Sequence, residues 1–519
     1  MPPSLFPGAD GLGFRRWMIV VAACLFAIWA GATLADSPYM VFAGFAGLLY
    51  VGTLSVNART LAWLVIALQP AALIVPFFPG RPFWWELCAL LAWPSLLAYG
   101  LLNRQKIAEL KFDRLERRAL VALAGYIIVL VSLMLFRGVG FRAFGGGQMG
   151  GRFYVQQVIL AVVPLLIIVA DPSRRQLFWV TVVGWLMSLT YLVSDLAFSL
   201  TGGSMQRILF FFELPTDAIN FVVGFEVTGM WRFQSLWYVA AAGLACIWTA
   251  APLRDLFGRY FFVAGPMMLG LLIMGLASGH RTLAVMVFTT LVSLSIFQRF
   301  WNPLRMIVGL CVVVAFTVTL YIVAEHLPLP VQRSISFLPG IEVDPLAERN
   351  ATDTIKDRIG ILELAVKDIP KYALLGRGFG MERLDLLPTD TVNDNVTTGY
   401  VNGIFYNGTL GLLLKTGLPG FICALIYIYI VSRIALELVR RVRQVPMDSQ
   451  TWFDRFCYLV SAQWFSMVTF FYFLHGDASL WVQNFALPSA LILICRRKQL
   501  GDPTEQLVKA LPFENTQPN

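Results

Sequence analysis

The chain has 519 residues, of which 58% are hydrophobic and only 14% charged, and its formal net charge at pH 7 is +9. A soluble globular domain carries about 25% charged residues, so the composition excludes an ordinary soluble protein. A positive balance indicates nucleic-acid binding when the basic residues form a soluble face. Here they lie mostly between apolar runs, so we expect no nucleic-acid partner.

The apolar runs are long enough to cross the hydrocarbon core of a bilayer as helices. They are continuous rather than alternating in polarity, which favours helices over a closed barrel. We therefore predict an all-α, polytopic integral membrane protein with about 14 transmembrane helices. The runs 38–54 and 60–78 are the weakest, and losing that pair would leave about twelve. The predicted spans are 17–35, 38–54, 60–78, 83–102, 119–136, 153–170, 177–198, 233–251, 261–278, 282–297, 306–324, 409–431, 456–474 and 481–495.

Basic residues set the predicted orientation, because cytoplasmic loops carry an excess of lysine and arginine. With these spans, the basic clusters at 15–16, 104–118, 174–175, 254–259, 299–305, 433–443 and 496–498 all fall on one side. Both termini are then cytoplasmic. We predict a multi-pass protein of the bacterial inner membrane, with its one long polar segment in the periplasm. No small-x-small cleavage site follows the first apolar run, so we expect that run to be retained as a span.

This topology divides the chain into four parts. Residues 1–324 form the first eleven spans, 325–408 a periplasmic loop with an amphipathic helix, 409–499 the last three spans, and 500–519 a disordered cytoplasmic tail. The seven cysteines all lie in or beside apolar runs and form no C-x-x-C pair. We therefore expect no disulfide framework, zinc site or redox motif.

Several arginines oppose the positive-inside trend. They map to outer loops or outer helix ends, and arginine presents a planar fork suited to phosphate oxygens. As a group they indicate an anionic substrate at the outer leaflet. The alternative for each is a carboxylate partner, with Asp195, Glu213, Asp217 and Glu226 nearby, or contact with lipid headgroups. The arginines are Arg137, Arg142, Arg152, Arg207, Arg232 and Arg281.

Two short outer turns contain histidine. Ser278 to Arg281 connects two apolar spans, and a His-Arg pair at membrane depth is a functional-site hypothesis by default. His475 lies in the second turn. Histidine can act as a general base near neutral pH, so His280 and His475 are both candidates. An ordinary interfacial histidine is the alternative for each.

The long loop contains a predicted amphipathic helix. Thr354-x-x-Asp357 is typical of a capping-box start, and Pro370 ends the run. Arg358 is expected near the junction with the membrane domain, with Asp357 pointing away. The stripe expected to pack on that domain is Ile355, Ile359, Leu362, Val366 and Ile369.

A glycine-rich turn, Leu375 to Gly380, follows this helix and carries Arg377. The glycines do not indicate dinucleotide binding, because no strand–helix context surrounds them. The carboxylates Asp390 and Asp394 come next, in a spacing too loose for a metal site. Tyr406 and Asn407 precede the return to the membrane.

Taken in order, these features resemble the O-antigen ligase and Wzy-type polymerase superfamily. The shared pattern is a Ser-x-Arg-like turn, a late outer loop with an Arg-bearing helix, a Pro-x-x-x-Leu-Gly-x-Gly sequence and a Gly-Leu-x-Gly span. The likeness covers about 260–431 in detail and the remainder only as topology. The matching residues are Ser278 to Arg281, Arg358, Leu375 to Gly380, and Gly417 to Gly420.

One position departs from the pattern. Ligases of this superfamily usually have a His-Asn pair just before the Gly-Leu-x-Gly span, and the corresponding pair here is Tyr406-Asn407. Polymerase-type members rely more on arginines. The departure therefore favours polymerase over ligase.

The resemblance implies a GT-C-like, inverting glycosyltransferase that needs no metal or other cofactor. Its donor would be a glycan on undecaprenyl pyrophosphate, used for exopolysaccharide or O-antigen. Other assembly proteins, such as a flippase and a chain-length regulator, are possible partners. The alternatives are an O-antigen ligase acting on lipid A core, a transporter or flippase of lipid-linked glycan, and a non-catalytic assembly subunit.

The same resemblance and the outer-side chemistry select the candidate site residues. The candidate catalytic residues are Arg281, Arg358, His280 and His475. The candidate substrate-binding residues are Arg142, Arg152, Arg232, Arg377, Tyr406 and Asn407. The general base stays open among His280, His475, Asp357 and Asp394.

Overall fold

The computed structural model describes residues 58–76, 81–102, 112–138, 151–201, 204–213, 233, 235–300, 307, 314, 317–379, 395–401, 403–474 and 476–500. These residues form helices joined by short turns, with two isolated β-bridges and no strand among them. The all-α prediction is therefore confirmed for this part of the chain.

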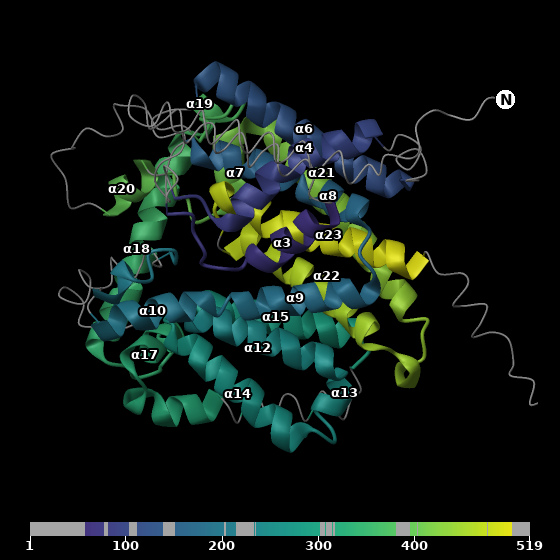
Figure 1. Ribbon diagram of the computed structural model, residues 1–519. Helices are drawn as coiled ribbons and strands as arrows, with labels where there is room; N and C mark the ends of the chain where they lie inside the picture. Colours follow the sequence, from purple (N-terminus) through teal and green to yellow (C-terminus); the bar gives the residue numbers. More distant parts are fainter. Residues whose placement is uncertain are drawn as a thin grey trace, which may run out of the picture.

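Most of the helices run side by side in one bundle (Figure 1). Their bounds are α3 Ala58–Leu68, α4 Trp84–Leu102, α6 Arg114–Arg137, α7 Arg152–Ala161, α8 Val163–Ala170, α9 Arg174–Met187, α10 Thr190–Thr201, α12 Leu236–Ala250, α13 Leu253–Leu256, α14 Phe261–Ala277, α15 Arg281–Phe297, α17 Leu329–Ile335, α18 Pro345–Lys367, α19 Ile369–Tyr372, α20 Asn395–Val401, α21 Gly408–Val442, α22 Trp452–Thr469 and α23 Trp481–Leu500. The short 3-10 helices are η1 Ser204–Arg207, η2 Ala324–His326, η4 Met447–Ser449 and η6 Ala478–Leu480, and η5 Phe470–Leu474 is a π-helical turn after α22.

Six helical segments of the described chain are long and apolar enough to cross a membrane, which identifies a membrane protein. They are Arg114–Arg137, Arg152–Ala170, Arg174–Thr201, Gly408–Val442, Trp452–Leu474 and Ala478–Leu500. The predicted spans 17–35 and 38–54, about half of 306–324, and the tail beyond residue 500 lie outside the described residues. The total of about 14 spans stays a prediction.

The predicted span 60–78 extends too far. Helix α3 ends at Leu68, because Pro70 has no N–H to donate and disfavours helix at the residue before it. The chain then folds back on itself, and Ile74 forms an isolated bridge with Phe83. This apolar stretch is a short helix followed by a turn.

Helix α21 lies at the centre of the core and packs against α6, α22 and α23. Interhelical hydrogen bonds supplement the apolar packing, as expected where lipid supplies no hydrophobic drive between helices. The Tyr427 hydroxyl lies 2.5 Å from the Ser489 hydroxyl, and Trp464 Nε1 donates to Ser432 Oγ at 2.9 Å. These contacts fix α21 relative to the helices around it.

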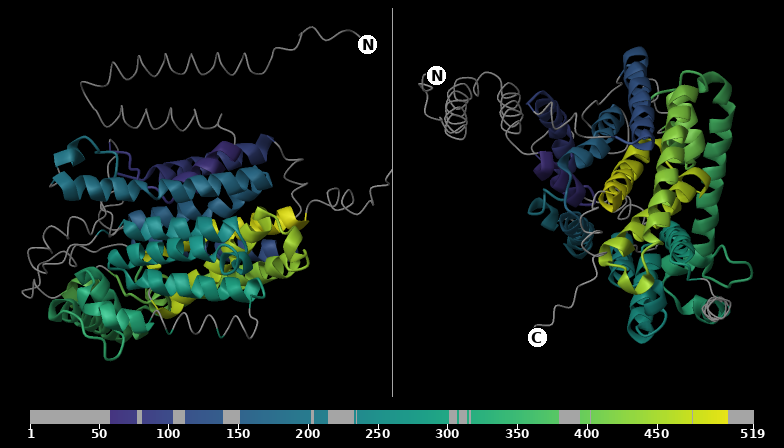
Figure 2. Two further views of the ribbon diagram at one scale, coloured as in Figure 1. Left: turned by 90° about the horizontal axis from the view of Figure 1, so that it is seen from below. Right: turned by 90° about the vertical axis from the view of Figure 1, so that its right-hand side faces the viewer.

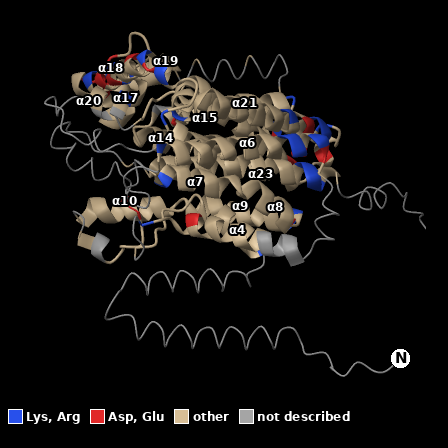
Figure 3. Ribbon diagram, turned by 90° about the horizontal axis from the view of Figure 1, so that it is seen from above, with Lys and Arg blue, Asp and Glu red and all other residues tan. Residues whose placement is uncertain are grey.

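Charged residues gather at two ends of the bundle, and the middle is nearly free of them (Figure 3). One end carries α17 to α20, and the views of Figures 1 and 2 show α18 running across that end rather than along the bundle. The other end carries the C-terminal ends of α21 and α23 and the start of α6. An apolar belt between two charged ends is the form expected of a protein that spans a bilayer.

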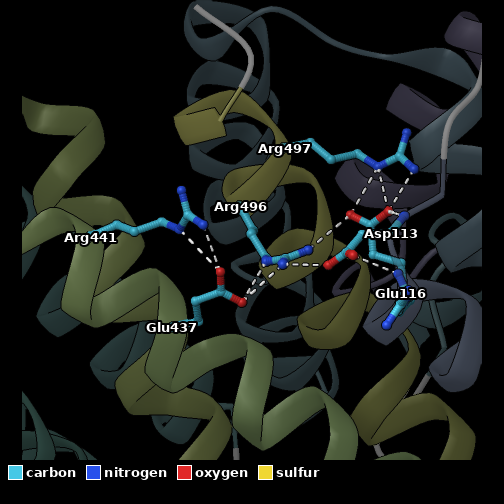
Figure 4. Close-up of polar contacts among 7 residues, drawn as sticks. Asp113, Glu116, Glu437, Arg441, Arg496 and Arg497 are labelled. Atoms are coloured by element: carbon cyan, nitrogen blue, oxygen red, sulfur yellow. Dashed lines mark hydrogen bonds and ion pairs between the residues drawn. The ribbon is translucent and has the colours of Figure 1, made fainter.

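An ion-pair network around the buried Arg496 and Glu116 joins three helices at the second end (Figure 4). Arg496 of α23 lies 2.7 Å from Asp113, which caps α6, and 2.9 Å from Glu437 of α21. Arg497 lies 2.7 Å from Glu116. Arg496 is only 3% exposed and Glu116 only 2%. The Arg496 guanidinium also holds the pKa of Asp113 below its usual value. Through these ion pairs, Arg496 and Arg497 join α23 to α6 and α21.

The start of α18 differs from the prediction. The helix begins at Pro345, with Asp344 as N-cap accepting a hydrogen bond from Leu346 N at 2.8 Å, whereas Thr354 lies mid-helix. An N-cap aspartate followed by proline at the first helical position is a strong start signal. The predicted end near Pro370 is correct, because α18 stops at Lys367.

The predicted packing face of α18 is wrong. Ile355, Ile359 and Val366 are exposed, whereas the buried face carries Ala351 and Ala365 together with Ile361 and Ala347. Small alanine side chains let α18 approach its neighbours closely. Arg358 and Asp357 are both half-buried, although the sequence placed only Arg358 near the junction and had Asp357 pointing away.

Candidate functional site

The glycine-rich turn docks against a break in α21. At Gly417 the backbone has φ 68° and ψ 179°, which interrupts the helix. Pro419 has no N–H for the carbonyl of Lys415, four residues earlier. Gly378 N supplies that bond instead, at 2.8 Å. The break therefore creates an open carbonyl that the turn satisfies.

A second pair of bonds completes this junction. Leu418 N donates to Ala373 O at 2.6 Å, and Arg377 N donates to Leu414 O, also at 2.6 Å. The turn from Leu375 to Phe379 and the Gly417–Gly420 motif, which are about forty residues apart in the sequence, thus lie side by side. The sequence suggested both motifs and gave no sign that each completes the other's hydrogen bonds.

Glycine is required at the closest point of this junction. Gly376 has φ +71°, and a Cβ there would lie 2.6 Å from Lys415 O. Gly417 has φ +68°, and its Cβ would lie 2.7 Å from Leu374 O. Both conformations disfavour other residues. Nearby, Phe379 N donates to the hydroxyl of the buried Tyr154 at 2.9 Å, which ties the turn to α7.

Arg377 extends from this turn toward α20. Its Nη1 lies 3.5 Å from Tyr400 O, and its guanidinium carbon lies 5.6 Å from the Tyr400 ring centroid. The Tyr400 hydroxyl donates to Asp368, and burial together with that carboxylate raises the pKa of Tyr400. Arg377 is therefore held at the bundle end between the turn and α20.

Arg358 stacks on Tyr406. Its guanidinium carbon lies 4.8 Å from the Tyr406 ring centroid, a cation–π geometry. Its Nε is buried and has no hydrogen-bond partner among the described residues. Burial lowers the pKa of Arg358, an effect opposed by Tyr406, but a guanidinium stays charged at neutral pH. An arginine with an unused donor, already partly desolvated, is suited to an anionic group.

Tyr406 and Asn407 play different parts at the start of α21. Tyr406 has φ +51°, uncommon for a residue other than glycine, and this backbone presents its ring to Arg358. The Asn407 side chain accepts a hydrogen bond from Leu410 N at 2.9 Å. It is the N-cap of α21, so its carboxamide oxygen already has a structural role.

The Ser278 to Arg281 turn is tied to α18 by Arg333, a residue that the sequence did not single out. Arg333 Nη1 donates to Gly279 O at 3.2 Å, and its Nη2 donates to Thr354 Oγ1 at 3.2 Å. Thr354 lies one helical turn before Arg358, so the turn and Arg358 belong to one connected region. The extra arginine could not be identified without knowing that α17 packs between them.

Of the two functional candidates in this turn, the structure describes the side chain of His280 but not that of Arg281. The His280 ring lies edge-on to Trp237, with centroids 5.6 Å apart. Arg281 begins α15, and its side chain is outside the described part of the structure. Arg142, Arg232, His475 and Asp394 are also outside it. Asp357 is half-buried on α18. The candidates for the general base are still His280, His475, Asp357 and Asp394.

Lys415 is a buried cation that the sequence interpretation missed. It is 7% exposed, and its Nζ lies 5.3 Å from the Phe379 ring centroid and 6.0 Å from that of Phe405. Burial raises the pKa of the nearby Asp477, and Lys415 opposes that rise. A lone lysine inside an apolar run is itself a signal, and it was present in the predicted span 409–431.

Arg152 forms a buried ion pair. It lies 3.0 Å from Glu86 and stacks on Phe83, and Gln156 donates to the same carboxylate. Glu86 was not among the four acids considered from the sequence. Burial raises the pKa of the adjacent Glu213 to about 7, with Arg152 opposing and Glu86 adding to the rise.

The described residues include no group of three His, Cys, Asp or Glu side chains placed to hold a metal ion. No protein-family model matches the chain. Nor does any curated protein match it significantly. The candidate site consists of Arg358 stacked on Tyr406 and Arg377 on the docked turn, with Arg333 joining the part of α18 that carries Arg358 to the Ser278 to Arg281 turn.

Proposed function

We propose that this protein is an inverting membrane glycosyltransferase that uses glycan linked to undecaprenyl pyrophosphate and polymerises it into surface polysaccharide. The observation that carries the proposal is the half-buried Arg358, stacked on Tyr406 with its Nε unsatisfied. A pyrophosphate leaving group concentrates negative charge, and preorganised cationic donors stabilise such charge as it develops. Arg377 brings a second guanidinium to the same end of the bundle.

The proposed reaction needs no redox step. An acceptor sugar hydroxyl attacks the anomeric carbon, a new carbon–oxygen bond forms, and the bond to the lipid pyrophosphate breaks with inversion. The pyrophosphate departs with the bonding electron pair toward Arg358, Arg377 and Arg281. A base takes the hydroxyl proton, for which His280, His475, Asp357 and Asp394 are the candidates. Arg142 and Arg232 are proposed to contact the donor from the outer loops.

The proposal also covers the number of spans and the orientation of the protein in the membrane. A GT-C-like arrangement of about 14 spans in the bacterial inner membrane would put both termini in the cytoplasm and α17 to α20 in the periplasm. The separation of the two charged ends supports a placement across the membrane (Figure 3). The donor lipid in the outer leaflet would then reach Arg358 from the bilayer.

Polymerase is favoured over ligase by what Tyr406 contacts. At the position where the resemblance leads us to expect a ligase histidine, this chain places a ring beneath Arg358. An aromatic face supports a guanidinium but does not supply an imidazole base. This arrangement fits chemistry that depends on arginine.

A reconstitution experiment tests the proposal. The full-length protein in proteoliposomes is given lipid-linked repeat units, and the products are sized by gel electrophoresis. Growth of the glycan chain on the lipid supports the polymerase. Transfer to added lipid A core would instead support a ligase. Movement of the donor across the membrane without new bonds would support a transporter, and either result would overturn the proposal.

A further inference from the structure

Two adjacent leucines project from the turn between α19 and the glycine-rich segment. Leu374 is 73% exposed and Leu375 70% exposed. They lie at the end of the molecule where α18 and α19 carry charged residues (Figure 3) and where α18 also exposes Ile355, Ile359 and Val366. A contiguous exposed apolar pair of this kind marks a contact surface rather than chance exposure.

The pair adjoins the exposed apolar face of α21. That face consists of Leu418, Ile422, Leu425, Ile426 and Tyr429, which recur at helical spacing on a helix long enough to cross a membrane. Residues 408–417 of the same helix are buried or half-buried. Leu418 is therefore the first exposed residue of α21, and its N donates to Ala373 O at 2.6 Å. The leucine pair follows immediately in the chain.

The length of α21 sets the depth in the bilayer at which Leu418 and the adjoining leucine pair lie. Arg433 is the first exposed charged residue after the apolar face and lies fifteen positions beyond Leu418. At 1.5 Å per residue, that distance is about 22 Å, less than the hydrocarbon thickness of about 30 Å. With Arg433 at one boundary, Leu418 lies inside the hydrocarbon near the other boundary. Leu374 and Leu375 lie beside it.

The polar residues next to the leucines match this depth. Lys367 and Lys371 are exposed on the preceding helices, and Lys371 Nζ lies 4.7 Å from the Tyr372 ring centroid. Lysine and tyrosine are the residues that place an apolar stem in the interface and a polar tip among headgroups. The sequence Lys-Tyr-Ala-Leu-Leu therefore begins with residues suited to the headgroup layer and ends with residues suited to the acyl chains.

We infer that Leu374 and Leu375 insert into the acyl-chain boundary of the bilayer and anchor the loop domain to it. The occupant of this apolar surface is lipid, because the surface continues the lipid-facing side of α21. The anchor fixes the depth of the docked turn, and hence of Arg377, relative to the phosphate layer. This inference does not depend on the glycosyltransferase proposal.

Photocrosslinking tests the anchor directly. p-Benzoylphenylalanine replaces Leu374 or Leu375 in the full-length protein, which is placed in nanodiscs of phosphatidylethanolamine and phosphatidylglycerol with radiolabelled acyl chains. Ile422 is the lipid-facing control, and Glu363, exposed on α18, is the aqueous control. Each variant is first required to elute as a monodisperse species.

We expect lipid adducts at both leucine positions at a level similar to Ile422 and several-fold above Glu363. Adducts no more frequent than at Glu363 would overturn the anchor. Predominant crosslinks to a second copy of the chain would also overturn it, because they would identify a protein contact instead. Neither readout requires enzymatic activity, so failure of this inference and failure of the proposed function are distinguishable.

Discussion

The guanidinium carbon of Arg358 lies 4.8 Å from the centroid of the Tyr406 ring, and this contact joins α18 to the start of α21. Arg358 lies on α18, which crosses the end of the bundle. Tyr406 directly precedes Asn407, the N-cap of the central helix α21. The pair therefore couples α18 to the central helix of the bundle.

Substitution of Tyr406 tests this contact. Tyr406→Phe keeps the ring face and should retain most of the activity, whereas Tyr406→Ala removes it and should lower polymer formation. A cation–π contact that is partly desolvated contributes about 1–2 kcal/mol, which corresponds to a loss of about 5- to 30-fold. Polymer made by a deletion strain carrying each variant is the measurement. Equal loss from both substitutions would instead assign the role to the hydroxyl.

The glycines at the α21 junction should tolerate no side chain. Gly417→Ala combines a positive φ with a Cβ 2.7 Å from a backbone oxygen, and backbone strain of this type costs about 1–3 kcal/mol before the clash is added. We expect a clear fall in the thermal midpoint of the purified protein. Gly270→Ala is the matched control, since its Cβ would meet nothing within 4 Å in the middle of α14. A similar fall in both variants would contradict the docking described above.

The charged network at the opposite end predicts an asymmetry between two arginines. Arg496→Ala leaves Glu116 without one of its partners in a site that is nearly closed to water, and breaking a buried pair costs about 3–5 kcal/mol. Arg441→Ala removes a partly exposed i,i+4 pair with Glu437, worth about 0–1 kcal/mol. Thermal unfolding in detergent should separate the two variants. Matching midpoints would show that Arg496 contributes no more than a surface pair.

Glu213 predicts a dependence of stability on pH. Its pKa is raised from a usual value of 4.5 to about 7, chiefly by burial, so the folded state binds the proton more tightly than the unfolded state. The stabilisation it contributes is complete below about pH 4.5 and is lost as pH rises to 7. Glu213→Gln should flatten that part of the curve of thermal midpoint against pH. An unchanged slope in the variant would assign the pH dependence to other groups.

The sequence predicted the class of fold and the position of most helices, because apolar length and continuity depend only on local composition. It placed the buried face of α18 wrongly. The stripe of Ile355 and Ile359 is the stronger apolar signal, but the residues that α18 buries include Ala351 and Ala365. Which of two faces a helix buries depends on its neighbours, and those are set by tertiary structure.

The candidate site was predicted in parts. Arg358 and Arg377 could be selected from the loop, and Lys415 could have been selected as a lone cation in an apolar run. The pairing of Arg152 with Glu86 and the bridge made by Arg333 could not, because both join residues from distant parts of the chain. The docking of Gly376 to Gly378 against the break at Gly417 was likewise hidden, although Pro419 marks where a helix carbonyl needs a new donor.

We propose that arginines at the bundle end support the transfer of glycan from lipid pyrophosphate. The most direct test of this role is polymer formation by Arg358→Ala in a deletion strain, compared with Arg349→Ala. Arg349 lies on the same helix and is 84% exposed in a surface pair with Asp353. Arg281→Ala is tested in parallel, and membrane levels of each variant are measured.

We predict that Arg358→Ala and Arg281→Ala abolish polymer while both proteins still reach the membrane, and that Arg349→Ala leaves polymer unchanged. Polymer at wild-type levels from both Arg358→Ala and Arg281→Ala would contradict the account.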